Sequence, residues 1–167
     1  MAACRRRCDE GEREGEPMLS NERLIRVQWG DCDPAGIVFY PRYFEWVDAS
    51  TILLFEKATG LTKIKMLERY GGAGLALLEA RAAFKVASQY GDDIRIATRV
   101  TEFRRTVFLV EHRVTRADGT LALEAFETRL WTVRDPATGR IRAGEMPAEI
   151  VAAFQAPGSD PSPLRSS

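Results

Sequence analysis

The sequence has no long hydrophobic run, since none of its stretches approaches the ~18 uninterrupted apolar residues that a membrane-crossing helix needs. Its first residues also lack the apolar segment of a signal peptide, so we expect a cytoplasmic protein with no membrane partner. Net charge is absent too, because 24 Lys and Arg residues balance 24 Asp and Glu residues in the chain of 167. We therefore expect no nucleic-acid partner, and any anion site must be local.

Cysteine and histidine are scarce, which restricts metal and redox chemistry. The cysteines, Cys4, Cys8 and Cys32, are odd in number, so a disulfide framework is not expected. Cys4 and Cys8 have the spacing of metal ligands, but His112 is the only histidine and no second pair of ligands completes a zinc site. We therefore expect neither a metal nor another cofactor. Cys32 stands between two aspartates whose charges disfavour a thiolate, and we interpret it as a small residue filling a turn.

Familiar catalytic motifs are also missing. The chain has no G-x-S-x-G nucleophile motif and no P-loop, and its single histidine has no neighbouring Ser or Cys that would form a triad. The glycine-rich stretch from Gly71 to Gly74 does not match a dinucleotide-binding pattern and is more typical of a turn before a strand. His112 follows the alternation of a strand and is interpreted as a structural or surface residue. Any chemistry must then come from carboxylates and backbone dipoles.

Hydrophobic periodicity between the two ends predicts one long helix among strands. Alternating residues from Ile25 to Trp29 indicate a half-buried strand, and a turn rich in Gly, Asp and Pro follows. Pro41 is in the place of a first helical residue, and apolar residues recur every three or four positions until Gly60, which predicts a helix. Period-two patterns predict the later strands at 75–86, 94–100, 107–114, 121–133 and 140–143. A helical turn is predicted after the last strand.

These elements predict an α+β domain in which a curved antiparallel sheet of about five to six strands wraps around a long central helix. Short connections favour hairpins, and a helix that is apolar over much of its surface suits a sheet curled around it, the arrangement known as the hotdog fold. A barrel with helices at one end is the structural alternative. Residues 1–20 and 156–167 are rich in charge or in Pro, Ser and Gly, so we expect a disordered arm and a disordered tail on either side of one domain, residues 21–155.

The most informative segment runs from Trp29 to Pro41. Two aspartates and a Pro-Ala-Gly turn lead into an apolar run that enters the helix, which places a carboxylate near a helix N-terminus. Tyr40 is a poor N-cap because it has no short side-chain oxygen, so the first amides of the helix are available to another acceptor, such as a substrate oxyanion. Equally, Asp31 or Asp33 could serve only to cap a turn, as Asp before Pro often does. The residues alone do not separate these two interpretations.

From Asp31 to Pro41, and on through Tyr43, Trp46 and Asp48, the chain closely resembles the active-site segment of the 4-hydroxybenzoyl-CoA thioesterase family of hotdog acyl-CoA thioesterases. The resemblance is to the Pseudomonas-type branch of this family. In the related Tol-Pal-associated thioesterases a histidine commonly occupies the position of the tyrosine before Pro41, so this chain points away from that branch. Weaker matches follow in the same order along the chain at Ala83-Phe84, Tyr90, Asp92-Asp93, Phe103-Arg104-Arg105, Arg140, Arg142 and Met146-Pro147-Ala148.

The resemblance implies a hydrolase acting on thioester bonds, with Asp33 as its catalytic carboxylate. Asp33 would attack the thioester carbonyl as a nucleophile or activate a water as a general base, and the backbone N–H of Tyr40 would bind the developing oxyanion. Asp31 is the rival acid, but in the family pattern the acid directly before Pro-Ala-Gly is the catalytic one. Gly36 in the same turn is expected to contact the substrate.

Asp48 is expected to have a partner, because it lies three or four positions from Phe44 and Thr51 on the apolar stripe of the helix, where an unpaired charge is costly. The resemblance places Asp48 near the end of the acyl pocket, where it would accept a hydrogen bond from a ring hydroxyl. The alternative is a structural carboxylate satisfied by backbone or by an arginine. The strand after Gly74 is more apolar than in the Pseudomonas-type enzyme, which leaves the exact acyl group open.

Four arginines are candidates for binding the phosphates of CoA. Arg104 and Arg105 lie where one predicted strand gives way to the next, and Arg140 and Arg142 are two residues apart in the last short strand, on one face. The resemblance implies that they correspond to the phosphate-contacting arginines of the family, and Arg suits bidentate phosphate contacts better than Lys. The alternative is that they are ordinary surface arginines.

Two classes of function remain. The first is an enzyme that hydrolyses an acyl-CoA, with an aromatic acyl group similar to 4-hydroxybenzoyl favoured; the second is a hotdog module that binds acyl-CoA without turnover. An acid poised at the helix start favours the enzyme, for which a short or medium aliphatic acyl-CoA or an acyl-carrier-protein thioester is the alternative substrate. Edge strands and an apolar sheet face that one helix cannot cover predict a homodimer or homotetramer, and the resemblance implies active sites at that interface.

Overall fold

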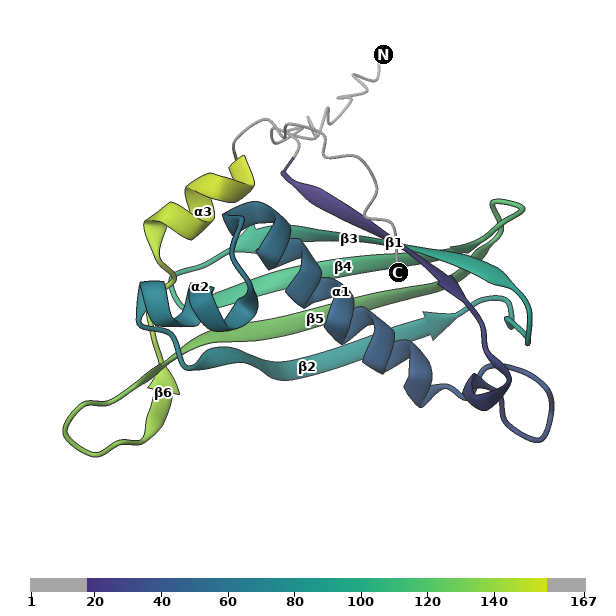
Figure 1. Ribbon diagram of the computed structural model, residues 1–167, viewed down its shortest axis with the longest axis horizontal. Coiled ribbons are helices and arrows are strands. Elements are labelled where there is room, and N and C mark those ends of the chain that lie inside the picture. Colours follow the sequence, from purple (N-terminus) through teal and green to yellow (C-terminus); the bar gives the residue numbers. More distant parts are fainter. Residues whose placement is uncertain (1–17, 156–167) are drawn as a thin grey trace, which may run out of the picture.

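The computed structural model describes residues 18–155, which form six strands, three α-helices and one short 3-10 helix (Figure 1). The strands are β1 (Ser20–Arg26), β2 (Gly74–Phe84), β3 (Asp93–Phe103), β4 (Val107–Arg116), β5 (Leu121–Arg134) and β6 (Ile141–Ala143). The helices are η1 (Trp29–Asp31), α1 (Pro41–Thr59), α2 (Lys63–Tyr70) and α3 (Ala148–Gln155). None of the described helices is long and apolar enough to span a membrane.

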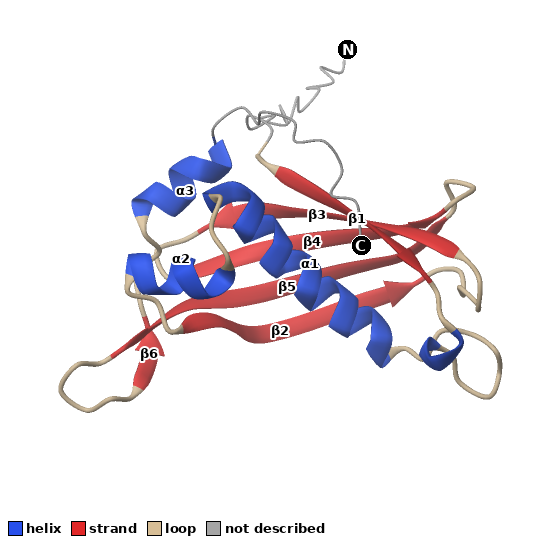
Figure 2. Ribbon diagram, in the orientation of Figure 1, coloured by secondary structure: helices blue, strands red, loops and turns tan. Residues whose placement is uncertain are grey.

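The strands make one antiparallel sheet in the order β1-β3-β4-β5-β2, with β6 paired to the end of β5. Short turns join β3 to β4 and β4 to β5, as the hairpins predicted from the sequence require. Figure 2 shows α1 lying across one face of this sheet. The α+β hotdog fold is confirmed, and the described strands do not close into a barrel, because β1 and β2 remain the two edges.

Local sequence fixes both ends of α1, the helix that carries part of the candidate site. Pro41 occupies the first helical position, where its missing N–H is no loss, and Gly60 ends the helix with φ +66°, a left-handed conformation that favours glycine. The face between them that packs on the sheet buries Tyr43, Trp46, Val47, Ser50, Thr51, Leu54 and Phe55. The apolar residues among them belong to two clusters, one under each half of the helix, so α1 is held against the sheet along its length.

Helix α2 is absent from the sequence-based prediction. It follows Thr62 and ends at Tyr70, after which Gly71, with a φ of +65°, is the left-handed C-cap. Met66 of this helix is fully buried. A helix of eight residues contains too few apolar repeats to stand out from a loop by periodicity. The interpretation of the stretch from Gly71 to Gly74 as a turn before a strand is confirmed, because β2 begins at Gly74.

The folded part of the chain begins earlier than expected. Ser20 is already the first residue of β1, and the Leu19 N–H donates to the carbonyl of Phe154 in α3 at 2.9 Å. Met18 and Leu19 pack against the apolar cluster beneath the second half of α1. Residues 18–20 therefore belong to the folded part of the chain and not to the predicted disordered arm. The rest of the predicted arm and tail, including Cys4 and Cys8, lies outside the described residues.

Candidate active site

The candidate catalytic loop is a tight hairpin between η1 and α1. The Asp33 N–H donates to the Ile37 carbonyl at 2.9 Å, and the Gly36 N–H donates to the Asp33 carbonyl at 2.9 Å. Gly36 has φ +78°, a conformation that is costly for any residue with a Cβ. The Val38 N–H donates at 2.8 Å to a carbonyl in the segment between β2 and β3, which fixes the loop to the body of the protein.

The Asp33 carboxylate is half-buried and keeps one oxygen available. Its Oδ1 accepts the Ala35 N–H at 2.8 Å, which holds the side chain over its own turn. The other oxygen makes no hydrogen bond or ion pair with any residue from 18 to 155. Turn capping, the structural alternative, is therefore present, but it occupies only half of the carboxylate.

Asp31, the rival acid, has both oxygens engaged. Its Oδ2 accepts the Gln28 N–H at 2.8 Å, and its Oδ1 lies 3.7 Å from Nε of Arg42 in an ion pair. The side chain is 17% exposed. This geometry is typical of a structural cap on η1, and it favours Asp33 as the reactive acid.

The start of α1 offers one backbone donor. Tyr40 is the N-cap, and its side chain caps no amide, as expected. Part of the helix start is satisfied by backbone, because the Arg42 N–H donates to Phe39 at 2.9 Å and the Tyr43 N–H to the Tyr40 carbonyl at 3.2 Å, while Pro41 has no N–H. Among residues 18–155 the Tyr40 N–H finds no acceptor, and it lies at the positive end of the helix dipole.

An apolar surface surrounds this loop. Trp29 and Tyr90 stack edge to face with ring centroids 5.7 Å apart, and the rings of Phe39 and Tyr40 do so at 5.4 Å. All four side chains are exposed, Trp29 the most at 75%. A gathering of exposed aromatic rings indicates a ligand or partner surface. Tyr43, in the first turn of α1, is buried, and burial raises the pKa of its phenol, which stays protonated at neutral pH.

Asp48 lies on the flank of α1 and pairs with Arg129. Nη2 of Arg129 is 2.6 Å from Oδ1 of Asp48, so the expected partner is present and is an arginine. The Asp48 side chain is 58% exposed, however, and the expectation that it lies on the buried stripe is wrong. The helix turns by 100° per residue, which carries Asp48 past the buried Val47 to the edge of the packed face.

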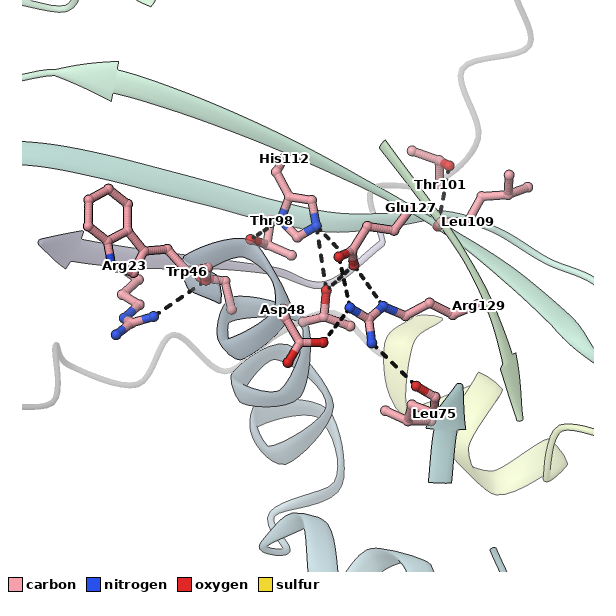
Figure 3. Close-up of polar contacts among 12 residues, drawn as sticks. Arg23, Trp46, Asp48, Leu75, Thr98, Thr101, Leu109, His112, Glu127 and Arg129 are labelled. Atoms are coloured by element: carbon pink, nitrogen blue, oxygen red, sulfur yellow. Dashed lines mark hydrogen bonds and ion pairs between the residues drawn. The ribbon is translucent and has the colours of Figure 1, made fainter. Parts of the chain in front are cut away.

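Behind this pair is a buried polar cluster, shown in Figure 3, most of which the sequence analysis missed. Oε2 of Glu127 accepts Nε–H of Arg129 at 2.7 Å and the Thr51 hydroxyl at 2.8 Å, and Oε1 accepts Nη2–H of Arg129 at 2.8 Å. His112, expected to be a structural or a surface residue, is structural. Its Nε2 lies 3.3 Å from Oε2 of Glu127, and its Nδ1 lies 2.9 Å from the Thr98 hydroxyl. Within residues 18–155 no group of His, Cys, Asp or Glu has the arrangement of a metal site.

Charge pairing outweighs burial in this cluster. Burial by itself raises the pKa of Glu127, but hydrogen bonds and charge from His112 and Arg129 hold it at about 2. Burial lowers the pKa of Arg129, but Glu127 and Asp48 together raise it above its ordinary value. A sequence signal for the pair existed, because Glu127 and Arg129 are two residues apart in β5 and share a strand face with the buried Trp131.

The turn between β3 and β4 presents the first pair of candidate phosphate ligands. Arg104 and Arg105 are both exposed, as expected. Arg104 already makes two hydrogen bonds of 2.9 Å to the carboxylate of Glu102. The carbonyl of Arg105 accepts the Met146 N–H at 2.9 Å, so this turn adjoins the chain that follows β6.

The second pair, Arg140 and Arg142, is exposed in the hairpin of β5 and β6. Strand β6 begins at Ile141, one residue later than expected, so Arg140 directly precedes the strand. The Arg140 carbonyl accepts the Asp135 N–H at 2.9 Å, which makes Arg140 part of the turn that closes the hairpin. Nε of Arg142 lies 3.7 Å from Oδ2 of Asp135.

Within one chain the candidate phosphate ligands and Asp33 lie at opposite ends of the sheet. The catalytic loop pairs with Gln89, shortly before β3 begins, whereas Arg104 follows the end of that strand. Strand β3 has eleven residues, which at about 3.3 Å per residue separates the two ends by about 35 Å. The fold thus brings Asp33, Gly36 and Tyr40 into one loop, and it leaves the arginines far from them.

Comparison with known proteins identifies the family. A family model described as the thioesterase-like superfamily matches residues 27–154. The chain is 36% identical over 132 residues to 4-hydroxybenzoyl-CoA thioesterase of Pseudomonas sp. strain CBS-3, covering 75% of this chain and 91% of that protein. It is 30% identical over 140 residues to the acyl-CoA thioester hydrolase YbgC of Escherichia coli O6:H1, covering 78% of this chain and 92% of that protein.

Solved structures agree with this assignment. A mutant 4-hydroxybenzoyl-CoA thioesterase in complex with 4-hydroxybenzoyl-CoA matches with a TM-score of 0.74 and 32% identity, over 81% of this chain and 98% of that chain. A gentisyl-coenzyme A thioesterase matches with a TM-score of 0.69 and 26% identity, over 80% of this chain and 99% of that chain. The family expected from the segment around Asp33 is confirmed, and this chain belongs to the thioesterase-like superfamily.

Proposed function

We propose that the protein hydrolyses the thioester bond of an aromatic acyl-CoA and releases the free acid and CoA. The observation that carries this proposal is the joint placement of Asp33 and Tyr40. Both residues belong to one fixed loop. One carboxylate oxygen of Asp33 has no partner among the described residues. The Tyr40 N–H, at the start of α1, has no acceptor among the same residues. Acyl transfer requires an attacking or proton-accepting group beside an oxyanion donor. The relatives support a thioester as the bond that is cleaved.

Asp33 opens the thioester in one of two ways. As a nucleophile, its free oxygen attacks the carbonyl carbon, the C–S bond breaks, CoA leaves as the thiolate, and a water then hydrolyses the mixed anhydride. As a general base, Asp33 instead takes a proton from a water that attacks the same carbon, after which the C–S bond breaks and CoA leaves as the thiolate. In both routes negative charge develops on the carbonyl oxygen that faces the Tyr40 N–H. That amide therefore stabilises the transition state more than the substrate.

Asp48 marks the far end of the acyl group. It is eight residues beyond Tyr40 on α1, which corresponds to about 12 Å along the helix axis. An aromatic ring with a hydrogen bond of about 3 Å at either end spans a comparable length. The oxygen of Asp48 that Arg129 leaves open accepts a hydrogen bond from a hydroxyl on the ring.

The complete site needs a second copy of the chain. Strand β2 is an open edge of the sheet, and its exposed side chains include Leu77, Leu78 and Phe84, each at least half exposed. A long apolar edge is a template for pairing with another strand. When two β2 strands pair antiparallel about a twofold axis, the arginine end of one chain comes beside the Asp33 end of the other. The open apolar edge of β2 supports a homodimer, alone or within a homotetramer, with active sites at the interface.

The arginines bind the phosphates of CoA in this assembly. Arg104 and Arg105 are exposed on a turn, and Arg140 and Arg142 are exposed in the neighbouring hairpin at the same end of the sheet. Guanidinium groups suit bidentate phosphate contacts, and such a local cluster explains how a chain of zero net charge holds a polyanionic ligand.

An aliphatic acyl-CoA or acyl-carrier-protein thioester is the second candidate substrate. Leu77 and Leu78 favour it, because both are at least half exposed on the strand that the second copy covers. Apolar side chains in such a place line a channel for a hydrocarbon chain as readily as they seal an interface.

A free-thiol release assay over a panel of acyl-CoA thioesters tests the proposal. The panel contains hydroxybenzoyl, benzoyl, phenylacetyl and short aliphatic thioesters, and we expect the fastest release from a hydroxylated aromatic one. Fastest release from an aliphatic thioester would favour the second candidate. Binding of the thioesters in calorimetry without release of thiol would contradict the enzyme and identify a binding module.

A further inference from the structure

We propose that Arg129 is a positioning residue that makes the enzyme select acyl groups carrying a hydroxyl. The inference rests on the proposed function. It adds that the Arg129 guanidinium orients the carboxylate of Asp48, which binds the acyl group. Arg129 is only 2% exposed, so it acts through Asp48 rather than by touching the substrate.

The Arg129 guanidinium is held on several sides, as Figure 3 shows. Its Nε and Nη2 donate to the two oxygens of Glu127 at 2.7 and 2.8 Å, and Nη1 donates to the Leu75 carbonyl at 3.3 Å. The second N–H of Nη2 donates to Oδ1 of Asp48 at 2.6 Å. Turning the guanidinium toward another group would break several of these bonds together. The direction of the bond to Asp48 is therefore fixed.

Glu127 is fixed in turn from the core. The Thr51 hydroxyl of α1 donates to its Oε2 at 2.8 Å, and Nε2 of His112 lies 3.3 Å from the same oxygen. Thr98 holds the other side of the His112 ring at 2.9 Å. Each of these side chains is 3% exposed or less, and Arg129 is equally buried. A fully partnered polar cluster in a packed core is rigid.

Asp48 differs from the rest of the cluster. It is 58% exposed, and its second carboxylate oxygen has no hydrogen bond to any residue from 18 to 155. Glu127 alone already balances the charge of Arg129 and takes two of its N–H groups. The further bond to an exposed carboxylate therefore exceeds what burial of Arg129 requires. Its effect is to hold one oxygen of Asp48 and leave the other open to a donor.

An open carboxylate oxygen of fixed direction discriminates between acyl groups. A ring hydroxyl donates to it, whereas an unsubstituted ring displaces water from the charge and supplies no bond in return. A freely rotating aspartate could turn back to water in that case. Asp48 cannot do so, because Arg129 holds it.

The change Arg129→Lys tests the inference, since lysine keeps the charge but lacks the planar fork that serves two carboxylates. The measured quantity is the ratio of kcat/KM for 4-hydroxybenzoyl-CoA to kcat/KM for benzoyl-CoA. We expect the wild type to prefer the hydroxylated thioester and Arg129→Lys to lower this ratio about tenfold. Asp48→Asn should lower it by a similar factor, and the double variant no further. The matched control is Arg113→Lys in β4, which pairs with Glu124 on the sheet and should leave the ratio unchanged.

A second variant, Asp48→Glu, keeps the test decisive if Arg129→Lys does not fold, because Asp48 is exposed. It retains the charge but moves the carboxylate by one methylene, and we expect the ratio to fall. Equal losses for both substrates in Arg129→Lys, or an unchanged ratio in Asp48→Glu, would overturn the positioning role and leave the thioesterase proposal standing. Equal kcat/KM of the wild type for the two thioesters would also overturn the positioning role without contradicting the thioesterase proposal. Absence of thiol release from every thioester in the wild type would instead overturn the proposed function.

Discussion

Replacing Glu127 with Gln removes the central charge of the buried cluster while keeping the size of the side chain. Glu127 is 3% exposed, and its carboxylate accepts two hydrogen bonds from Arg129 and one from Thr51. The change leaves the Arg129 guanidinium in the core with Asp48 as its remaining carboxylate partner. Breaking a buried ion pair by removing one partner is costly, because the other charge stays behind.

The pKa of Glu127 sets the size of the effect. It is held at about 2, below the ordinary value of 4.5, which corresponds to about 3 kcal/mol of stability. Because the pKa is lowered in the folded state, this stability is fully present above the unfolded value of about 4.5 and is lost as the pH falls toward 2. We therefore expect Glu127→Gln to lower the free energy of unfolding by about 3 kcal/mol at pH 7. The difference from the wild type should shrink steadily below pH 4.5.

Urea unfolding of both proteins at pH 7, 5, 4 and 3 measures this difference, at one protein concentration because self-association adds to apparent stability. The matched control is Glu124→Gln on the same strand, whose side chain is 23% exposed and pairs with Arg113, and we expect it to cost less than about 1 kcal/mol. A deficit in Glu127→Gln that does not change between pH 7 and pH 3 would refute the reasoning from charge.

Three further predictions concern the site and the assembly. The double change Arg104→Ala with Arg105→Ala should raise KM for a CoA thioester far more than it lowers kcat, should be mimicked by added salt, and should leave hydrolysis of a phosphate-free pantetheine thioester unchanged. Gly36→Ala should cost about 1–2 kcal/mol in thermal unfolding and should slow turnover, because a Cβ there meets no atom but φ is +78°. Leu78→Lys on the open edge of β2 should shift sedimentation toward a smaller species, and a stable, active wild-type monomer at micromolar concentration would contradict the proposed assembly.

Much of the fold follows from local signals in the sequence. Pro41 and Gly60 mark the ends of α1, and period-two alternation predicts the long strands, because each signal depends only on residues close together in the chain. Helix α2 is missed because eight residues carry little periodicity, and the short strand β6 begins one residue later than expected because Arg140 belongs to its turn.

The candidate site is predictable only in part, for a different reason. The loop from Asp33 to Tyr40 is contiguous in the chain, so the sequence alone predicts that its residues lie close together. The exposure of Asp48 depends on where α1 rests on the sheet. The bond of Arg129 to Asp48 joins β5 to α1 across 81 residues. Periodicity assigns such residues to a face, but it does not show which of them meet. The separation of the arginines from Asp33 likewise depends on the topology of the sheet.

The most direct test of the central claim is the turnover of 4-hydroxybenzoyl-CoA by Asp33→Asn, compared with the wild type and with Asp31→Asn. Asparagine keeps the shape of the side chain but removes the nucleophile or base, so we expect turnover to fall by a factor on the order of 10²–10⁴. Asp31→Asn should lose less, because both oxygens of Asp31 serve the fold. Turnover near the wild-type rate in Asp33→Asn, or a larger loss in Asp31→Asn, would contradict the assignment of the chemistry to Asp33.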